Sequence, residues 1–474
     1  MHRQINYSIN HLEISKSVII SISFFIILYI FNIIEIELYS ICALISSIIL
    51  LIDIFVILKQ EKYLVNPFLY LDVFLFFTTV FAPIFHFYSG SWLVYITNIP
   101  EDWTPFANKL SGLYLFCILI LFITRNILDA KLIPPKNYYM QIANHKKLKY
   151  IYILMFISFI LQTYIYIDFG GILGYIRNYG EGNFSGYGAL FIISELFPLL
   201  FILIFFIKSR HNFLYHKWTV IYLFLFLLFI SCLYFGGLRG SRSNTLWTLL
   251  HAILLIHISI RKFRKKQIIL IALLAFGFLY VGKIYKNTRG TIIFENNYSL
   301  EQDIRGSDIL AGDLSRYSIQ TYLIYLYERR TDYTLKLGST YIGDLLKFTP
   351  IDQGIDKVMA GTELLVSKNA YIVGNKSSRV YGLLGESILN FGIILSPIVF
   401  ILFAIIITNI KKFNESFSVN DLRLFLVPLF INFTIILFNS DLDNVFFFFI
   451  KRIIPMYIVI YLIKYRLHKK LIVI

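Results

Sequence analysis

The chain has 474 residues, of which 58% are hydrophobic and only 15% are charged, and its mean hydropathy is +0.70. A soluble domain carries about 25% charged and about 45–50% apolar residues, so this composition excludes a soluble enzyme, a disordered chain and a secreted disulfide scaffold. The net charge of +16 has two explanations, a nucleic-acid-binding surface or an excess of Lys and Arg on the cytoplasmic side of a membrane protein.

Twelve apolar stretches are candidates for helices that cross a bilayer, since a span needs roughly 20 residues. They are 17–34, 38–58, 68–88, 108–128, 150–169, 188–207, 218–235, 244–260, 267–282, 383–408, 422–438 and 445–463. The first stretch follows a polar start that shows no cleavage site of small residues, so we expect a retained span rather than a signal peptide. The polar break at Glu35 and Glu37 is short, which gives the count an error of about one or two spans.

Lys and Arg residues alternate between the two ends of these stretches. The connections on one side hold more than half of the 44 Lys and Arg, including the 125–149 loop and the RKFRKK segment at 261–266, whereas the short connections on the other side hold few. This alternation predicts an all-α polytopic membrane protein with about 12 spans and both termini in the cytoplasm. It also accounts for most of the net charge, so we expect no nucleic-acid partner.

The spans divide the chain into three predicted parts. Residues 1–282 carry the first nine spans, 283–382 form a large loop outside the cytoplasm, and 383–474 carry the last three spans. Within the loop, 308–330 has helical spacing and is expected to lie on the membrane or to pack over the spans. Its apolar face holds Ile319, Tyr322, Leu323 and Leu326.

Sequence motifs for nucleotides, metals and internal symmetry are missing. The predicted cytoplasmic loops contain no GxGxxG, P-loop or HExxH pattern, and no cluster of His, Asp and Glu has metal-ligand spacing. We therefore expect no metal and no other cofactor. No internal repeat is visible, which gives no support to an inverted-repeat transporter.

The segment YFGGLRGSRSN, from Tyr234 to Asn244, carries arginines on the side where basic residues are rare. Arg239 and Arg242 are three residues apart and would project from one face of a helical turn. Ser241 and Asn244 lie at the start of the next span, where helix amides favour an anion. Guanidinium groups beside a helix N-terminus suit a phosphate or pyrophosphate, although arginines that reach lipid headgroups are an alternative explanation.

Other charged residues on the outer side have more than one interpretation. Arg177, in GGILGYIRNYGEGNFSGYG, and Arg289, in KIYKNTRG, could contact the same anion or lie at the surface. Glu386, in YGLLGESILNFG, could act as a general base toward a sugar hydroxyl, cap its helix or pair with Arg379. Asp344, in GSTYIGDLLKFTP, is a weaker candidate for the base.

Two basic residues lie inside the last predicted span. Lys451 and Arg452 are roughly 10 Å from its outer end at a rise of 1.5 Å per residue, where a charge is costly unless it is paired or faces water. They either form ion pairs with Asp441 or Asp443, in the preceding NSDLDN turn, or line a polar cavity. His251, in the span at 244–260, is expected to be a packing or interfacial residue.

With these residues, the chain resembles bacterial oligosaccharide repeat-unit polymerases of the Wzy type, which assemble O-antigen and capsular polysaccharides. The resemblance rests on GLRGSRSN at the end of a span, on a long outer loop late in the chain, and on the exit from that loop, GSTYIGDLLKFTPIDQ…RVYGLLGESILNFGIILSP. It covers about 236–397, whereas the first 200 residues match in hydropathy alone. Pro350-Ile351-Asp352 stands where the family often has a Pro-Arg pair, so no arginine role carries over at that position.

The resemblance implies a metal-independent glycosyltransferase of the membrane-embedded C class in the bacterial cytoplasmic membrane. Both substrates would be oligosaccharides on undecaprenyl diphosphate, and the growing chain would move onto a fresh repeat unit at the outer leaflet. Arg239 and Arg242, helped by Arg177 or Arg289, would stabilise the departing lipid diphosphate. Glu386 would take the proton of the acceptor hydroxyl. No ATP is implied, and a chain-length regulator remains an open partner besides the lipid bilayer.

Three alternatives remain. An O-antigen ligase, which transfers the same chain onto a lipid A core, would show the same outer arginines and late loop. A flippase for the lipid-linked oligosaccharide would be expected to show internal pseudo-symmetry and cationic residues spread through a central cavity. A glycosyltransferase with its acidic pair in the first outer loop would use Glu35 and Glu37, but that loop is short for a site.

Overall fold

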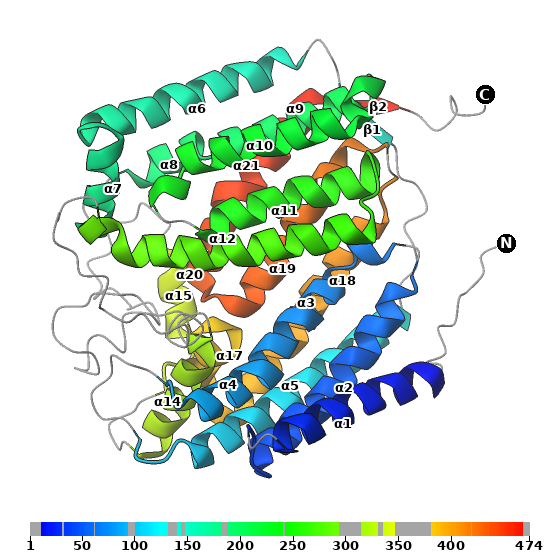
Figure 1. The fold of residues 1–474 in the computed structure, drawn as a ribbon, viewed down its shortest axis with the longest axis vertical. Helices are drawn as coiled ribbons and strands as arrows, with labels where there is room; N and C mark the ends of the chain where they lie inside the picture. Colours follow the sequence, from blue (N-terminus) through cyan, green and yellow to red (C-terminus); the bar gives the residue numbers. More distant parts are fainter. Residues whose placement is uncertain are drawn as a thin grey trace. The chain divides into compact units, whose positions relative to one another are not determined.

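The computed structural model describes twelve stretches of the chain, which form two compact units (Figure 1). The described residues are 11–30, 33–60, 62–92, 100–130, 140–143, 147–181, 187–239, 242–292, 314–329, 335–346, 381–418 and 420–467. Unit 1 comprises Met1–Pro134, Arg305–Glu415 and Phe433–Phe447. Unit 2 comprises Pro135–Ile304, Ser416–Asn432 and Phe448–Ile474.

Unit 1 is built from long apolar helices and several shorter ones. Its helices are α1 (His11–Ile30), α2 (Leu38–Leu58), α3 (Pro67–Phe76), α4 (Ala82–Ser89), α5 (Thr104–Ala130), α14 (Ser315–Arg329), α15 (Ser339–Leu346), α17 (Gly382–Leu395), α18 (Val399–Glu415), the end of α19 (Val427–Asn439) and α20 (Leu442–Phe448). A π-helical turn, Phe77–Phe81, joins α3 to α4. Pro83 follows that turn and lacks the N–H group that an α-helix would need, which favours the wider turn.

Helices α2, α3, α5 and α18 lie side by side and enclose the main core of unit 1 (Figure 1). Leu50, Leu71, Leu110 and Ile407 contribute one fully buried side chain from each of these helices. The start of α3 is fixed by Asn66, whose side chain accepts a hydrogen bond from the backbone N–H of Phe68 at 3.0 Å. Apolar burial at these positions is the main source of stability inside the unit.

Helix α14 confirms the helix predicted inside the long loop. The four residues predicted to share its apolar face are all buried, in one cluster with Trp103, Tyr381 and Leu389. Helix α14 also contacts α5, where Ser111 and Tyr317 share a hydrogen bond of 2.8 Å. It therefore packs over the helices of unit 1 through both apolar and polar contacts.

Unit 2 is also mainly helical. Its helices are α6 (Lys149–Asp168), α7 (Gly171–Glu181), α8 (Gly188–Ser194), α9 (Phe197–Ser209), α10 (Trp218–Tyr234), α11 (Arg242–Ser259), α12 (Lys265–Ile292), the start of α19 and α21 (Ile454–Ile463). Helices α9, α10 and α11 contact one another. A second π-helical turn, Phe449–Ile453, leads into α21, and Pro455 again follows the turn.

Unit 2 also contains a short β ladder, which the prediction of an all-α chain did not include. Strand β1 (Met140–Ala143) pairs antiparallel with β2 (Lys464–Leu467), so that Met140 lies opposite Leu467. The ladder joins the basic loop after α5 to the segment that follows the last apolar helix. Helices otherwise dominate the described residues.

Every predicted span overlaps a helix, and eight helical segments are long and apolar enough to cross a membrane. These eight are Leu38–Leu58, Pro67–Ser89, Thr104–Asp129, Lys149–Asp168, Leu190–Ser209, Gly382–Glu415, Leu422–Asn439 and Leu442–Ile463. Shorter apolar helices occupy Ile14–Ile30, Trp218–Tyr234, Ser243–Ser259 and Lys266–Gly282. This number of long apolar helices among the described residues indicates a polytopic membrane protein.

The predicted outer loop at 283–382 falls largely outside the described residues. Helix α12 continues through the predicted end of its span to Ile292, and α14 and α15 lie within the loop. The three-part division of the chain stays a prediction.

Candidate functional site

A cluster of buried charged side chains in unit 2 is centred on Glu195, at the junction of α8 and α9. Its side chain is 2% exposed, and its Oε2 atom lies 2.7 Å from Lys451 Nζ and 3.9 Å from Arg452 Nη2. Arg452 Nη1 also donates to the backbone carbonyl of Glu195 at 3.2 Å. Two cations therefore share one carboxylate.

The π-helical turn Phe449–Ile453 explains how two consecutive residues reach the same carboxylate. An α-helix turns neighbouring side chains about 100° apart, whereas the wider turn lets both Lys451 and Arg452 be buried. Pro455 favours this turn, because it has no N–H group for the Lys451 carbonyl. Such π turns are frequent at functional sites.

The glycine-rich segment singled out in the sequence packs against Glu195. Gly236 has a φ of +139°, and a Cβ atom there would lie 3.3 Å from Glu195 Cδ. Asn244, in the first turn of α11, donates from Nδ2 to Glu195 Oε2 at 3.4 Å. The segment therefore contributes one close backbone approach and one amide group to the cationic cluster.

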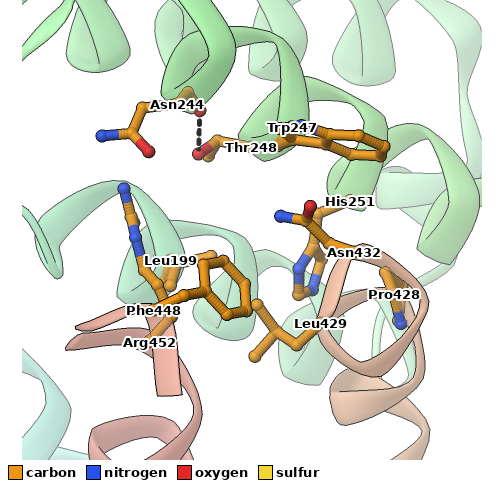
Figure 2. Close-up of a pocket in the computed structure, with 10 residues that line it drawn as sticks. All are labelled: Leu199, Asn244, Trp247, Thr248, His251, Pro428, Leu429, Asn432, Phe448 and Arg452. Atoms are coloured by element: carbon orange, nitrogen blue, oxygen red, sulfur yellow. Dashed lines mark hydrogen bonds between the residues drawn. The ribbon is translucent and has the colours of Figure 1, made fainter. Parts of the chain in front are cut away.

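A small cavity in unit 2 opens beside Arg452 (Figure 2). It is lined by Leu199, Asn244, Trp247, Thr248, His251, Pro428, Leu429, Asn432, Phe448 and Arg452. Its volume is ≈ 20 Å³, enough for about one water molecule. Figure 2 also shows the hydrogen bond of 2.7 Å by which Thr248 Oγ1 donates to the Asn244 carbonyl, one turn earlier in α11.

Two polar side chains of this cavity have no hydrogen-bond partner among the described residues. They are His251, at both ring nitrogens, and Asn432, at Oδ1, and both side chains are buried. The His251 ring lies 4.6 Å from the Phe425 ring, which accounts for the packing role expected from the sequence. A buried polar group without a partner costs about 1–3 kcal/mol, so the cavity favours a polar occupant such as a water or an anion oxygen.

The structure brings together two of the predicted substrate-binding residues, Arg452 and Asn244, in this one cavity. The backbone places Arg239 at the end of a 3-10 helix, Gly237–Arg239, and Arg242 at the first residue of α11. Several predicted side chains lie outside the described part of the structure, namely those of Arg177, Arg239, Arg242, Arg289 and Asp344, as does the whole of Ser241.

Glu386, the predicted general base, belongs to unit 1 and lies in α17. Its carboxylate is buried, Oε1 accepts from Thr340 Oγ1 at 3.0 Å, and Oε2 accepts from the backbone N–H of Leu442 at 2.9 Å. Asn390 extends this network by donating to Thr340 Oγ1 at 2.6 Å. Glu386 therefore caps the first turn of α20, a helix-capping role like one of the alternatives weighed from the sequence.

Asp441, in the NSDLDN turn, caps a helix. Its Oδ1 accepts from the backbone N–H groups of Tyr381 and Gly382 at 2.8 and 2.9 Å, at the start of α17. Helices α17 and α20 thus cap each other, through Asp441 in one direction and Glu386 in the other. The structure gives Lys451 an ion pair with Glu195, a carboxylate outside the NSDLDN turn, and Arg452 lines a cavity, which was the other alternative from the sequence.

Glu195 was not predicted as a site residue, although the sequence contains a signal for it. A carboxylate inside the apolar stretch at 188–207 is costly in a membrane unless it is paired. An acid in one apolar stretch and two basic residues in another, Lys451 and Arg452, together indicate an ion pair. The sequence does not indicate the geometry of that pair.

Groups of His, Cys, Asp and Glu that could hold a metal ion do not occur among the described residues. Compared with protein-family models, with curated proteins and with solved structures, the chain matches none of them.

Proposed function

We propose that the chain is a polysaccharide polymerase of the bacterial cytoplasmic membrane. It would join oligosaccharide repeat units carried on undecaprenyl diphosphate at the outer leaflet, for O-antigen or capsule. The observation that carries the proposal is the buried cluster of Glu195, Lys451 and Arg452, which holds two cations on one carboxylate beside a polar cavity. The resemblance in the GLRGSRSN segment adds to it, because that segment supplies Asn244.

The proposed reaction would use the cations of this cluster. Transfer of the growing glycan breaks the bond between its first sugar and the lipid diphosphate, which keeps the electron pair and gains negative charge. Donors fixed in a dry site stabilise such a charge better than water does. Arg452 lines the cavity and would contact the phosphate, whereas Lys451 would act through Glu195 and its own charge. Arg239 and Arg242 are proposed to supply further donors, because a cavity of ≈ 20 Å³ is too small for a whole diphosphate.

The proposed topology has 12 spans, both termini in the cytoplasm and the fold of a membrane-embedded C-class glycosyltransferase. Contacts inside each unit support the sidedness. Arg210 donates to the Asp421 carbonyl, and Lys411 pairs with Asp129 at 2.8 Å. In each pair, both residues belong to connections predicted to be cytoplasmic. Strands β1 and β2 likewise join two predicted cytoplasmic segments.

For proton transfer, Glu386 remains the proposed base. Both carboxylate oxygens of Glu386 already accept hydrogen bonds, so this role requires the contact with Thr340 or with Leu442 to open when the acceptor sugar binds. No cofactor and no nucleic acid are part of the proposal.

The glycan profile of a deletion strain tests the function. Loss of a polymerase leaves lipid A or the capsule anchor with single repeat units, and complementation restores a ladder. If lipid A or the capsule anchor carries no repeat unit at all in the deletion strain, the result would favour one of the alternatives, an O-antigen ligase or a flippase. An unchanged ladder in the deletion strain would overturn the proposal.

A further inference from the structure

Three helices of unit 1 carry ionisable side chains into the apolar bundle. They are Asp53 in α2, Asp72 in α3 and Arg125 in α5, each within a segment apolar enough to span a membrane. Asp53 is 3% exposed and Asp72 is fully buried. Charges in such positions are expensive and mark functional sites more often than surface charges do. This cluster is separate from the residues on which the proposed function rests.

Arg125 forms an ion pair with Asp53. Its Nη1 and Nη2 atoms donate to Oδ2 and Oδ1 of Asp53 at 2.5 and 2.6 Å, a bidentate pair. The guanidinium carbon also lies 4.7 Å from the ring centre of Phe68 and 4.8 Å from that of Phe122. The positive charge of Arg125 therefore compensates one carboxylate and is held in place by two rings.

Asp72 is a second carboxyl group for which no such compensation exists among the described residues. Neither of its oxygens accepts a hydrogen bond from them. Its carboxyl group lies within hydrogen-bonding reach of the Asp53 carboxyl group. Two carboxyl groups in contact in an apolar interior are not both ionised unless a second cation compensates them.

The neighbouring charged groups do not supply that cation. Lys411, in α18, and Asp129, at the end of α5, pair with each other at 2.8 Å and add no net charge. Asp53, Asp72 and Arg125 together thus lack one positive charge. A calcium or magnesium ion would need about six or more oxygen ligands, whereas the two carboxyl groups of this cluster supply four oxygens, two of which already accept hydrogen bonds from Arg125.

We propose that Asp53 and Asp72 form a buried acid pair that binds a single proton between their carboxyl groups, with Arg125 neutralising the remaining negative charge. The proton makes the hydrogen bond that joins α2 to α3, and its loss would place two like charges in contact. The ligand of this site is a proton, and the site does not depend on any glycan or lipid substrate.

Infrared difference spectroscopy of the full-length protein in lipid nanodiscs tests this site at neutral pH. The wild type should show the C=O stretch of a protonated carboxylic acid, which Asp72→Asn should lose and Asp72→Glu should shift. Asp129→Asn is the matched control, because Asp129 is a partly exposed acid in an ion pair, and it should keep the band. Identical bands in the wild type and Asp72→Asn would overturn the proposal.

A second measurement uses the wild-type protein alone and therefore stays valid if Asp72→Asn folds poorly. The wild-type spectrum alone is recorded in sodium-containing and sodium-free buffer. A proton site gives the same acid band in both buffers. A band that appears only without sodium would mean that the pair binds a metal cation, and the proton assignment would then be wrong.

Discussion

Lys451 Nζ lies 2.7 Å from Glu195 Oε2, and the two side chains are 5% and 2% exposed. A pair as buried as this needs strong mutual compensation, because each ion has lost its water. Arg452 approaches the same oxygen and the carbonyl of the same residue, so the carboxylate is shared rather than dedicated to one cation. The arrangement positions Arg452 at the cavity while Lys451 keeps Glu195 neutralised.

A double-mutant cycle measures this relationship. Glu195→Gln leaves two buried cations without their carboxylate and is expected to cost about 3–5 kcal/mol of unfolding free energy. Lys451→Met should cost less, because Arg452 remains to compensate Glu195. The double variant should be more stable than the sum of the single effects predicts, as measured by thermal unfolding in nanodiscs. Additive effects would show that the pair is not coupled.

Gly236 is predicted to tolerate no side chain. Gly236→Ala places a methyl group against the Glu195 carboxylate in a backbone region that L-residues avoid, and should destabilise the protein by more than about 1 kcal/mol. Gly277, in α12, is the matched control, because a methyl group added there would meet no other atom within 4 Å. Gly277→Ala should stabilise by about 0.5–1 kcal/mol. Equal effects of the two substitutions on the melting temperature would contradict the close approach.

Glu386→Gln separates a capping role from a proton-transfer role. Glutamine keeps one acceptor but turns an NH₂ group toward a donor, which should cost about 1–3 kcal/mol of stability. If Glu386 is also the base, polymer growth should stop in protein that is still inserted and folded. A ladder reduced only in proportion to the folded protein would assign Glu386 to capping, and Asp344 would become the next candidate for the base.

Arg239→Ala and Arg242→Ala should leave the protein inserted but end polymer growth, read from a surface glycan gel. Replacement of either residue by Lys should fail as well if a bidentate fork holds the phosphate, because Lys provides a point charge. Rescue by Lys would indicate that charge alone is sufficient. Ladders of normal length in both Ala variants would remove these two residues from the proposed phosphate site.

Apolar length and helical spacing predicted the helices well, because a span is defined by local composition. The apolar face of α14 was visible for the same reason, as a periodic pattern over a few turns. The partner of Arg452 could not be predicted in this way. Glu195 lies 257 residues earlier, and the contact depends on a π turn that brings two consecutive side chains together.

The mutual capping of α17 and α20 illustrates the same limit. Asp441 and Glu386 both had several plausible partners in the sequence, and the choice among them follows from tertiary packing. Asp53 and Asp72 show the opposite case, since each is an acid inside an apolar stretch and could have been singled out from composition. Their proximity required the packing of α2 against α3.

Arg452→Met tests the central claim most directly. The substitution leaves Lys451 and Glu195 as a neutral pair, so the protein should fold and insert at wild-type levels. Arg261→Met, which removes an exposed arginine of unit 2, is the control and should give a normal ladder. In a complemented deletion strain, we predict that Arg452→Met yields only single repeat units on the surface glycan gel. A ladder of wild-type length from folded Arg452→Met protein would contradict the proposed role of this cationic cavity.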